Sequence, residues 1–251
     1  MYTECEGIVL RQIKAANGRR MVALFSKKYG KISAGSNISE KGRSKAALAM
    51  RPFTFGRYEL FRNRDSSNIN RAEVIRSFYR IGENVDKYMC ASYVLEFTDK
   101  LLPEENPVPR LFDLLIEFFT LLEERKSKHE TLVSAYQIKA MDILGFAPQL
   151  ERCVLCGDTD VSGGFSVRDG GVICKACAKK IPAVQNVSLI FPVDIGTINV
   201  LKYFLGHSLR SLEKIGLEDG SQMRIRRLLR QCTEYHLGVS GLKSESFFDQ
   251  E

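Results

Sequence analysis

Over the first 80 residues, short apolar runs alternate with turn signals, a pattern typical of β-strands joined by tight loops. Asn17-Gly18 is a typical two-residue hairpin signal, and Tyr29-Gly30 marks another turn. Gly56 falls inside an aromatic run and predicts a bulge or bend. Strands are expected over residues 6–12, 20–26, 31–34, 53–62 and 69–78. Five short strands in this length predict a small barrel, and the five-stranded oligonucleotide-binding (OB) fold is the obvious candidate.

From Glu83 onward the hydrophobic period becomes that of α-helices. Pro103 ends the first helix, and Gly145 ends the third. Helices are expected over residues 83–102, 111–122, 132–144, 194–206 and 221–238. The predicted fold class is therefore α+β and multidomain, with an OB barrel in residues 1–80 and a helical domain in residues 81–251.

Four cysteines interrupt the helical half in a C-x2-C, seventeen residues, C-x2-C array: Cys153, Cys156, Cys174 and Cys177. This spacing is typical of a structural zinc site, in which two short loops each offer two thiolates to one tetrahedral ion. Four thiolates fill the coordination shell, whereas a catalytic zinc keeps one position open for water or substrate. The array predicts one structural Zn²⁺ in segment 151–180 and no catalytic metal.

The residues around the cysteines support a zinc ribbon. Gly157 lets the first knuckle turn tightly, and the glycine-flanked stretch 163–171 predicts strand-like structure that returns the second knuckle to the first. The second knuckle, Cys174-Lys175-Ala176-Cys177, has no glycine and is less typical. The polar start Met1-Tyr2-Thr3-Glu4 shows no export signal, which argues against disulfides, and no βαβ unit supports a redox C-x-x-C.

Charge separates the two halves of the 251-residue chain. Residues 1–80 contain 17 lysines and arginines against 6 aspartates and glutamates, a net charge of +11. Residues 81–251 contain 20 against 24, a net charge of −4. Such asymmetry indicates a polyanionic partner for the first half. No apolar run of about 18 residues occurs, so no membrane span is expected.

Phosphate binding needs lysines and arginines spaced along one surface. The loop Ser39-Glu40-Lys41-Gly42-Arg43-Ser44-Lys45 lacks an apolar anchor and is expected to be exposed. The predicted nucleic-acid contacts are Lys41, Arg43 and Lys45, supported by Lys27, Lys28, Lys31, Arg19 and Arg20. For any single one of these residues, a solvated surface role remains open.

A second basic cluster lies near the C-terminus, and no catalytic motif accompanies either cluster. A buried stripe of Ile225, Leu228, Cys232 and Tyr235 would leave four arginines facing outward, either toward DNA or toward acidic side chains of this half. These are Arg224, Arg226, Arg227 and Arg230. Phosphate-loop, dinucleotide-binding, zinc-protease and nucleophile-elbow motifs are all absent from the sequence, so a non-enzymatic function is expected.

Several ordered motifs resemble one family along nearly the whole chain. They are EGIVLR, LFSKKYGKIS, SYVLEFTDKLLPEENP, RLFDLLIE, ILGFAPQLERCVLCG, GGVICKACA and GLKSESFF. On these motifs the chain resembles the RecO family of bacterial DNA repair proteins. It departs from the family at Ala15-Ala16-Asn17-Gly18-Arg19-Arg20, where an acidic, polar stretch is usual, and in the basic loop, where Arg43 comes one place early.

The resemblance implies an OB barrel, a helical domain with a zinc ribbon, and a function as a recombination mediator. Such a protein binds single- and double-stranded DNA and anneals complementary strands. It acts with RecR, and in many species RecF, to load RecA onto DNA coated by single-stranded-DNA-binding protein, whose acidic C-terminal tail it contacts. The expected location is the cytoplasm, at the nucleoid.

Two other readings remain open on the sequence. The chain could be a protein-docking adaptor whose barrel does not bind DNA, in which case no oligonucleotide would bind even at low salt. It could also be a metal-dependent nuclease without a recognisable motif, in which case magnesium would support cleavage of DNA.

Overall fold

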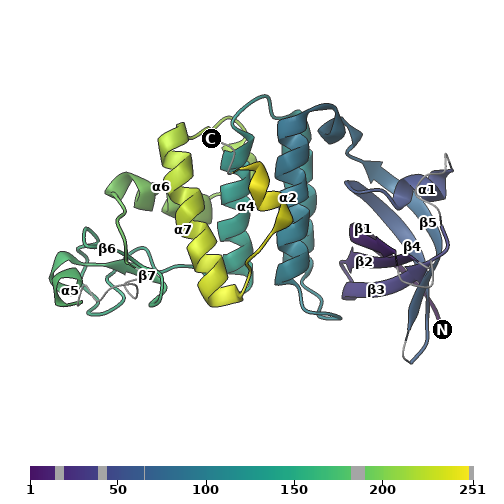
Figure 1. The fold of residues 1–251 in the computed structure, drawn as a ribbon, viewed down its shortest axis with the longest axis horizontal. Coiled ribbons are helices and arrows are strands. Elements are labelled where there is room, and N and C mark those ends of the chain that lie inside the picture. The colour runs from purple at the N-terminus through teal and green to yellow at the C-terminus, as the bar shows by residue number, and fades with distance from the viewer. Residues whose placement is uncertain (15–19, 39–43, 65, 182–189, 249–251) are drawn as a thin grey trace. The chain divides into compact units, whose positions relative to one another are not determined.

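A computed structural model describes residues 1–14, 20–38, 44–64, 66–181 and 190–248 (Figure 1). The chain forms two compact units. The first comprises Met1–Glu124 with Gly241–Glu251, and the second comprises Arg125–Ser240. These units divide the chain differently from the expected boundary near residue 80, which stays a prediction. Among the described helices, none is both long and apolar enough to cross a membrane.

The first unit contains the predicted five-stranded barrel. Its strands are β1 (Tyr2–Lys14), β2 (Arg20–Ser26), β3 (Gly30–Ser36), β4 (Thr54–Arg62) and β5 (Ser67–Ser77). They close in the order β1-β2-β3-β5-β4. Neighbours are antiparallel except β3 and β5, which pair in parallel over only three residue pairs. The α+β class and the OB-like N-terminal fold are confirmed.

Local sequence explains the irregularity in the β4–β5 pairing and the burial of Tyr58. The β4–β5 register shifts between Phe55 and Gly56, which confirms the expected irregularity at this glycine. A Cβ at Gly56 would lie 2.8 Å from the Glu73 carbonyl oxygen, so the strands approach too closely there for a side chain. Tyr58 is fully buried, and its hydroxyl donates to the Ala49 carbonyl at 2.6 Å.

That carbonyl belongs to α1 (Lys45–Ala49), a short helix that the hydrophobic pattern did not predict. Ser44 caps it by accepting a hydrogen bond from the Ala47 N–H at 3.1 Å. Ala47 and Ala49 are buried against the barrel. A five-residue helix is too short to show a 3.6-residue period, so its stability comes from this cap and this packing.

Helices complete the first unit. They are α2 (Val85–Leu101), α3 (Pro109–Glu124) and the 3-10 helices η1 (Tyr79–Glu83) and η3 (Lys243–Phe247). The leucine and phenylalanine stripe of α3 is buried as expected. Phe112 of α3 contacts Phe25 and Phe55 of the barrel, with ring centroids 5.3 and 5.8 Å apart. Aromatic contacts therefore pack α3 against the barrel.

The second unit consists of helices and a small sheet. Its elements are α4 (His129–Ile143), α5 (Lys175–Lys180), α6 (Ile195–Gly206), η2 (Arg210–Leu212), α7 (Asp219–Leu237) and strands β6 (Gly164–Ser166), β7 (Gly171–Ile173) and β8 (Ile190–Phe191). The strand order is β7-β6-β8. On α7 the expected stripe is buried at Ile225, Leu228 and Cys232. The prediction was wrong at Tyr235, which is 49% exposed because it lies near the end of the helix.

Candidate metal centre and nucleic-acid interface

The cysteine ribbon, residues 151–181, brings its two knuckles together through the hairpin of β6 and β7. Phe165 pairs with Val172 in this hairpin, and both side chains are buried. Gly163 lies against the second knuckle: a Cβ there would be 2.3 Å from the carbonyl carbon and oxygen of Cys174. The expected strand-like return between the knuckles is therefore present as a true hairpin.

The two knuckles turn by different means. At the first knuckle Gly157 has a φ of +78°, and its N–H donates to the Cys153 carbonyl at 2.8 Å. At the second knuckle Cys174 is the N-cap of α5, and its sulfur accepts the Cys177 N–H at 3.4 Å. The second knuckle needs no glycine because a helix start makes the turn.

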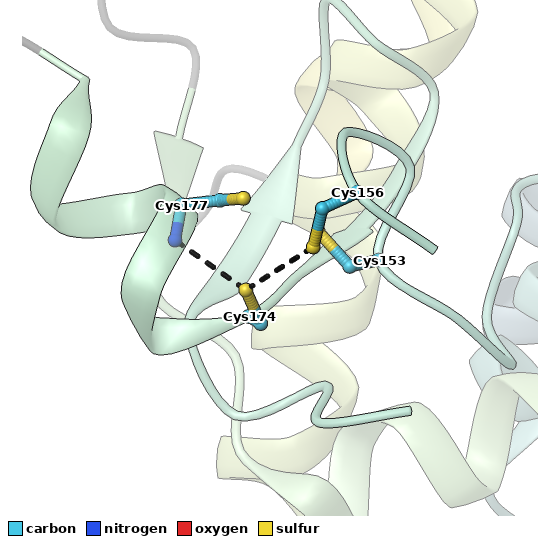
Figure 2. Close-up of side chains that lie close together, drawn as sticks. All are labelled: Cys153, Cys156, Cys174 and Cys177. Carbon is cyan, nitrogen blue, oxygen red and sulfur yellow. Dashed lines mark hydrogen bonds between the residues drawn. The ribbon is translucent and has the colours of Figure 1, made fainter. Parts of the chain in front are cut away.

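These turns bring all four cysteine sulfurs within 4.8 Å of one another. Figure 2 shows Cys174 and Cys177 at the start of α5 opposite Cys153 and Cys156 on a loop. The sulfurs of Cys156 and Cys174 are 3.7 Å apart. Four sulfurs bound tetrahedrally to Zn²⁺ at about 2.3 Å would be separated by about 3.8 Å, so the cluster matches the donor set and size of a structural zinc site.

The electrostatics of the cluster favour a bound cation. Burial alone would raise the pKa of the Cys153 thiol, but backbone N–H groups of Cys174, Leu155 and Cys156 point at its sulfur and hold the pKa at about 6. Contacts with Cys156 and Cys174 raise the pKa of Cys177 to about 12, because neighbouring sulfurs share protons. A bound cation would attract all four thiolates, so the sulfurs would no longer compete for protons.

Three cysteines of the metal candidate, Cys153, Cys174 and Cys177, belong to or pack against a small apolar core. Cys153, Cys174 and Ile173 are buried together, and Val154, Cys177, Ala178, Ile181 and Ile190 pack against them. This core shields Cys153 and Cys174 from solvent, whereas Cys156 is exposed and Cys177 is half-buried. Four sulfur ligands would fill the tetrahedral shell of a bound ion and leave no open coordination position.

The predicted nucleic-acid contacts are only partly described. Lys41, Arg43 and Arg19 lie outside the described residues. Lys45 is exposed at the first position of α1, with no ion pair to any described residue. Arg20 begins β2 opposite Lys14 and is half-buried.

Lys27, Lys28 and Lys31 surround the β2–β3 turn but have different environments. Lys28 is exposed, and its ammonium lies 4.9 Å from the centre of the Tyr29 ring. The Lys27 ammonium contacts a carboxylate oxygen of Asp113 at 2.6 Å. The Lys31 side chain is only 11% exposed and donates to the Asp99 carbonyl at 2.8 Å. Lys31 therefore anchors the barrel strand to α2.

Other barrel cations, like Lys31, form ion pairs with carboxylates that lie later in the chain, and the sequence did not reveal this pattern. Five barrel cations form ion pairs with carboxylates from the stretch 99–123: Arg11 with Asp99, Lys27 with Asp113, Lys31 with Asp99 and Glu104, Arg62 with Glu105, and Arg76 with Glu123. The acidic motif TDKLLPEEN was the available signal, but its partners are distant in sequence. Part of the excess positive charge of residues 1–80 is thus neutralised within the first unit.

The second basic cluster also meets acidic partners. Arg226 lies 3.1 Å from a carboxylate oxygen of Glu130, and Arg224 lies 3.6 Å from one of Asp194. Arg227 lies over the Phe191 ring, 5.2 Å from its centre. The two ion pairs favour the acidic-pairing interpretation of the cluster for Arg224 and Arg226.

Comparison with known proteins decides the family. A sequence model described as "Recombination protein O C terminal" matches residues 82–246, and one described as "Recombination protein O N terminal" matches residues 1–78. The chain belongs to the RecO family. Membership confirms the family expected from the motifs and gives the chain a role in DNA repair and recombination.

Curated RecO relatives align along nearly the whole chain. The chain is similar to the "DNA repair protein RecO" of Pelotomaculum thermopropionicum, with 32% identity over 98% of this chain and 93% of the relative. The protein of the same name from Bacillus subtilis is 29% identical, and that of Halalkalibacterium halodurans is 27% identical. Each of these two alignments covers 100% of this chain and 95% of the relative.

Proposed function

We propose that this protein is a non-enzymatic recombination mediator that binds single- and double-stranded DNA and anneals complementary strands. With RecR and RecF it would help load RecA onto DNA coated by single-stranded-DNA-binding protein, contacting the acidic tail of that protein. Membership of the RecO family over both halves is the observation that carries the proposal. A role on the chromosome implies the cytoplasm and the nucleoid.

The DNA contacts are proposed on cations of the barrel, with the exposed ones first. Lys45 is exposed and follows Lys41 and Arg43 closely in the sequence, and Lys28 is exposed at the β2–β3 turn. Lys27 and Lys31 join carboxylates of the same unit, so their contribution to DNA binding requires exchange of an internal partner for a phosphate. Arg20 at the start of β2 and its sequence neighbour Arg19, which lies outside the described residues, complete the proposed set.

Annealing follows from charge without a covalent step. Two DNA strands repel each other through their phosphates, and lysines that neutralise phosphates release condensed counterions. A protein surface that holds both strands lowers their mutual repulsion and raises their local concentration.

We propose that the four cysteines hold one structural Zn²⁺. The close approach of the four sulfurs and the small apolar core support this assignment. The ion would fix the two knuckles and the start of α5 and would take no part in chemistry on DNA.

A protein-docking adaptor is the second candidate. The ion pairs that five barrel cations form with the stretch 99–123 favour it, because cations already paired with carboxylates are less available to phosphates.

Salt-dependent binding separates these candidates. Single-strand affinity should fall steeply with salt, and replacing Lys41, Arg43 and Lys45 with Ala should reduce the slope of log K against log[salt] by about 2. A variant with Ala at Lys100, Lys126 and Lys214, all exposed, controls for the change in net charge. Fluorescence anisotropy with a labelled oligonucleotide measures both quantities. Absence of binding at low salt would favour the adaptor, and an unchanged slope in the triple variant would refute the loop assignment.

A further inference from the structure

Helix α5 has two faces with different roles. Cys177, Ala178 and Ile181 pack against the buried cysteine cluster. Lys175, Ala176, Lys179 and Lys180 are exposed. On a helix the pairs 175/179 and 176/180 are each four residues apart, so these four residues share the face opposite the cluster. The solvent face of α5 therefore carries three lysines, one alanine and no acidic residue.

Two of these lysines lack an internal acidic partner. Within the described ranges of the chain, Lys179 and Lys180 form no ion pair. Lys175 differs, because its N–H donates to the Asp160 carboxylate at 3.4 Å and its charge helps lower the pKa of that group after the hydrogen bonds from Ser162. The α5 lysines thus contrast with Lys27 and Lys31 of the barrel, whose ammonium groups contact carboxylates.

The cysteine cluster determines the position of this lysine face. Cys174 caps α5 and Cys177 lies within it, so two of the four cluster cysteines fix the helix. The lysine ammonium is a compact, strongly hydrated point charge. Several exposed lysines on one helix face therefore suit the phosphates spaced along a nucleic-acid backbone. They carry no base-reading geometry, so the surface would bind without sequence preference.

We propose that the solvent face of α5, formed by Lys175, Lys179 and Lys180, is a second phosphate-binding surface for nucleic acid. Resting on the proposed DNA function, this surface holds the backbone of a second strand or a duplex, separately from the barrel cations. Annealing needs two strands on one protein, and a surface on each unit supplies two places for them.

The competing role for these lysines is to stabilise α5 and the cysteine cluster themselves. Lysines in the last turn of a helix interact favourably with its C-terminal carbonyls, and they also balance the negative charge of four thiolates. If that were their only role, their removal would weaken metal retention and leave DNA binding unchanged.

Paired variants of the full-length protein test the proposal. Lys179→Ala/Lys180→Ala removes two charges from the face, and Lys126→Ala/Lys214→Ala removes two from exposed positions of the same unit. The first pair should reduce the slope of log K against log[salt] for a labelled duplex by about 2, and the control pair should leave it unchanged. Metal content, measured with a chromophoric chelator after thiol modification, should stay at the wild-type value for both.

Lysine footprinting of the unmodified chain gives an independent measurement. Acetylation with and without duplex DNA should show protection of Lys179 and Lys180 but not of Lys126 and Lys214. Unprotected α5 lysines, an unchanged slope, or metal loss without a DNA effect would each overturn the proposal. Failure of the wild-type chain to bind any DNA would instead refute the proposed function on which it rests.

Discussion

At the level of single residues, Glu96 of α2 holds the C-terminal segment in place. One carboxylate oxygen accepts the Lys243 N–H at 2.9 Å, and the other accepts the Ser244 N–H at 2.9 Å and the Ser244 hydroxyl at 2.6 Å. Burial alone would raise the pKa of Glu96, but the bonds from Ser244 and Lys243 outweigh it and lower the pKa below its usual value. The final described residues of the chain are thereby tied to α2 of the first unit.

Replacing Glu96 with Gln should destabilise this segment at neutral pH. The amide has one acceptor oxygen instead of two and turns a donor toward an N–H, so the free energy of unfolding should fall by about 2 kcal/mol. Because the folded pKa is lowered, the stabilisation by Glu96 is present above the unfolded pKa and is lost as pH falls through the folded pKa. Urea unfolding at pH 7 and at decreasing pH should show the variant and the wild type converging in acid.

Glu124→Gln provides the matched control for that comparison. Glu124 is exposed at the end of α3 and has no hydrogen-bond or ion-pair partner among the described residues. Its replacement should leave the free energy of unfolding within about 0.5 kcal/mol of wild type. Equal effects of the two replacements would contradict the assigned role of Glu96.

At the level of elements, periodic pattern predicted the long helices and the five strands, and it did not predict contacts between distant segments. The stripe of α3 and the irregularity at Gly56 follow from local sequence. The clamp at Arg125 does not: this buried side chain donates to the carbonyls of Ser127, Lys128, Leu212, Glu213 and Ile215. Nothing near residue 125 in the sequence indicates acceptors almost ninety residues away.

The two candidate sites also differ in how far local sequence predicts them. The cysteine spacing predicted all four members of the cluster, because a short C-x2-C loop determines its own geometry. The environment of Lys31 was not predictable from the turn beside it, since Asp99 of α2 and Glu104 beyond the end of α2 are distant in sequence.

Gly163→Ala should disturb the cysteine ribbon without touching a cysteine. The added Cβ would lie 2.3 Å from the Cys174 carbonyl, and a backbone neighbour cannot move away cheaply. We expect a loss of about 2 kcal/mol in stability and faster release of zinc to a chromophoric chelator. Gly206→Ala is the control, because a Cβ there meets nothing within 4 Å. Equal zinc-release rates in the two variants would contradict this account of the knuckle.

At the level of the whole molecule, the net charge of +7 does not show which cations are paired with carboxylates and which are exposed, and this differs between residues within each unit. In the first unit, many barrel cations are paired with carboxylates of the stretch 99–123, while Lys28 and Lys45 remain exposed. In the second unit, Arg224 and Arg226 are paired, while Lys179 and Lys180 remain exposed. We propose that a polyanion binds at the exposed lysines of the barrel and of α5, rather than wherever the chain carries positive charge.

The rate at which two complementary oligonucleotides anneal, each coated with single-stranded-DNA-binding protein, tests the central claim most directly. A fluorescence-quenching pair on the two strands reports the rate without nucleotide cofactor or magnesium. The proposed function predicts acceleration on the order of ten-fold or more over the protein-free rate, decreasing as salt rises. A rate equal to the protein-free rate, with the chain folded and carrying one zinc, would contradict it.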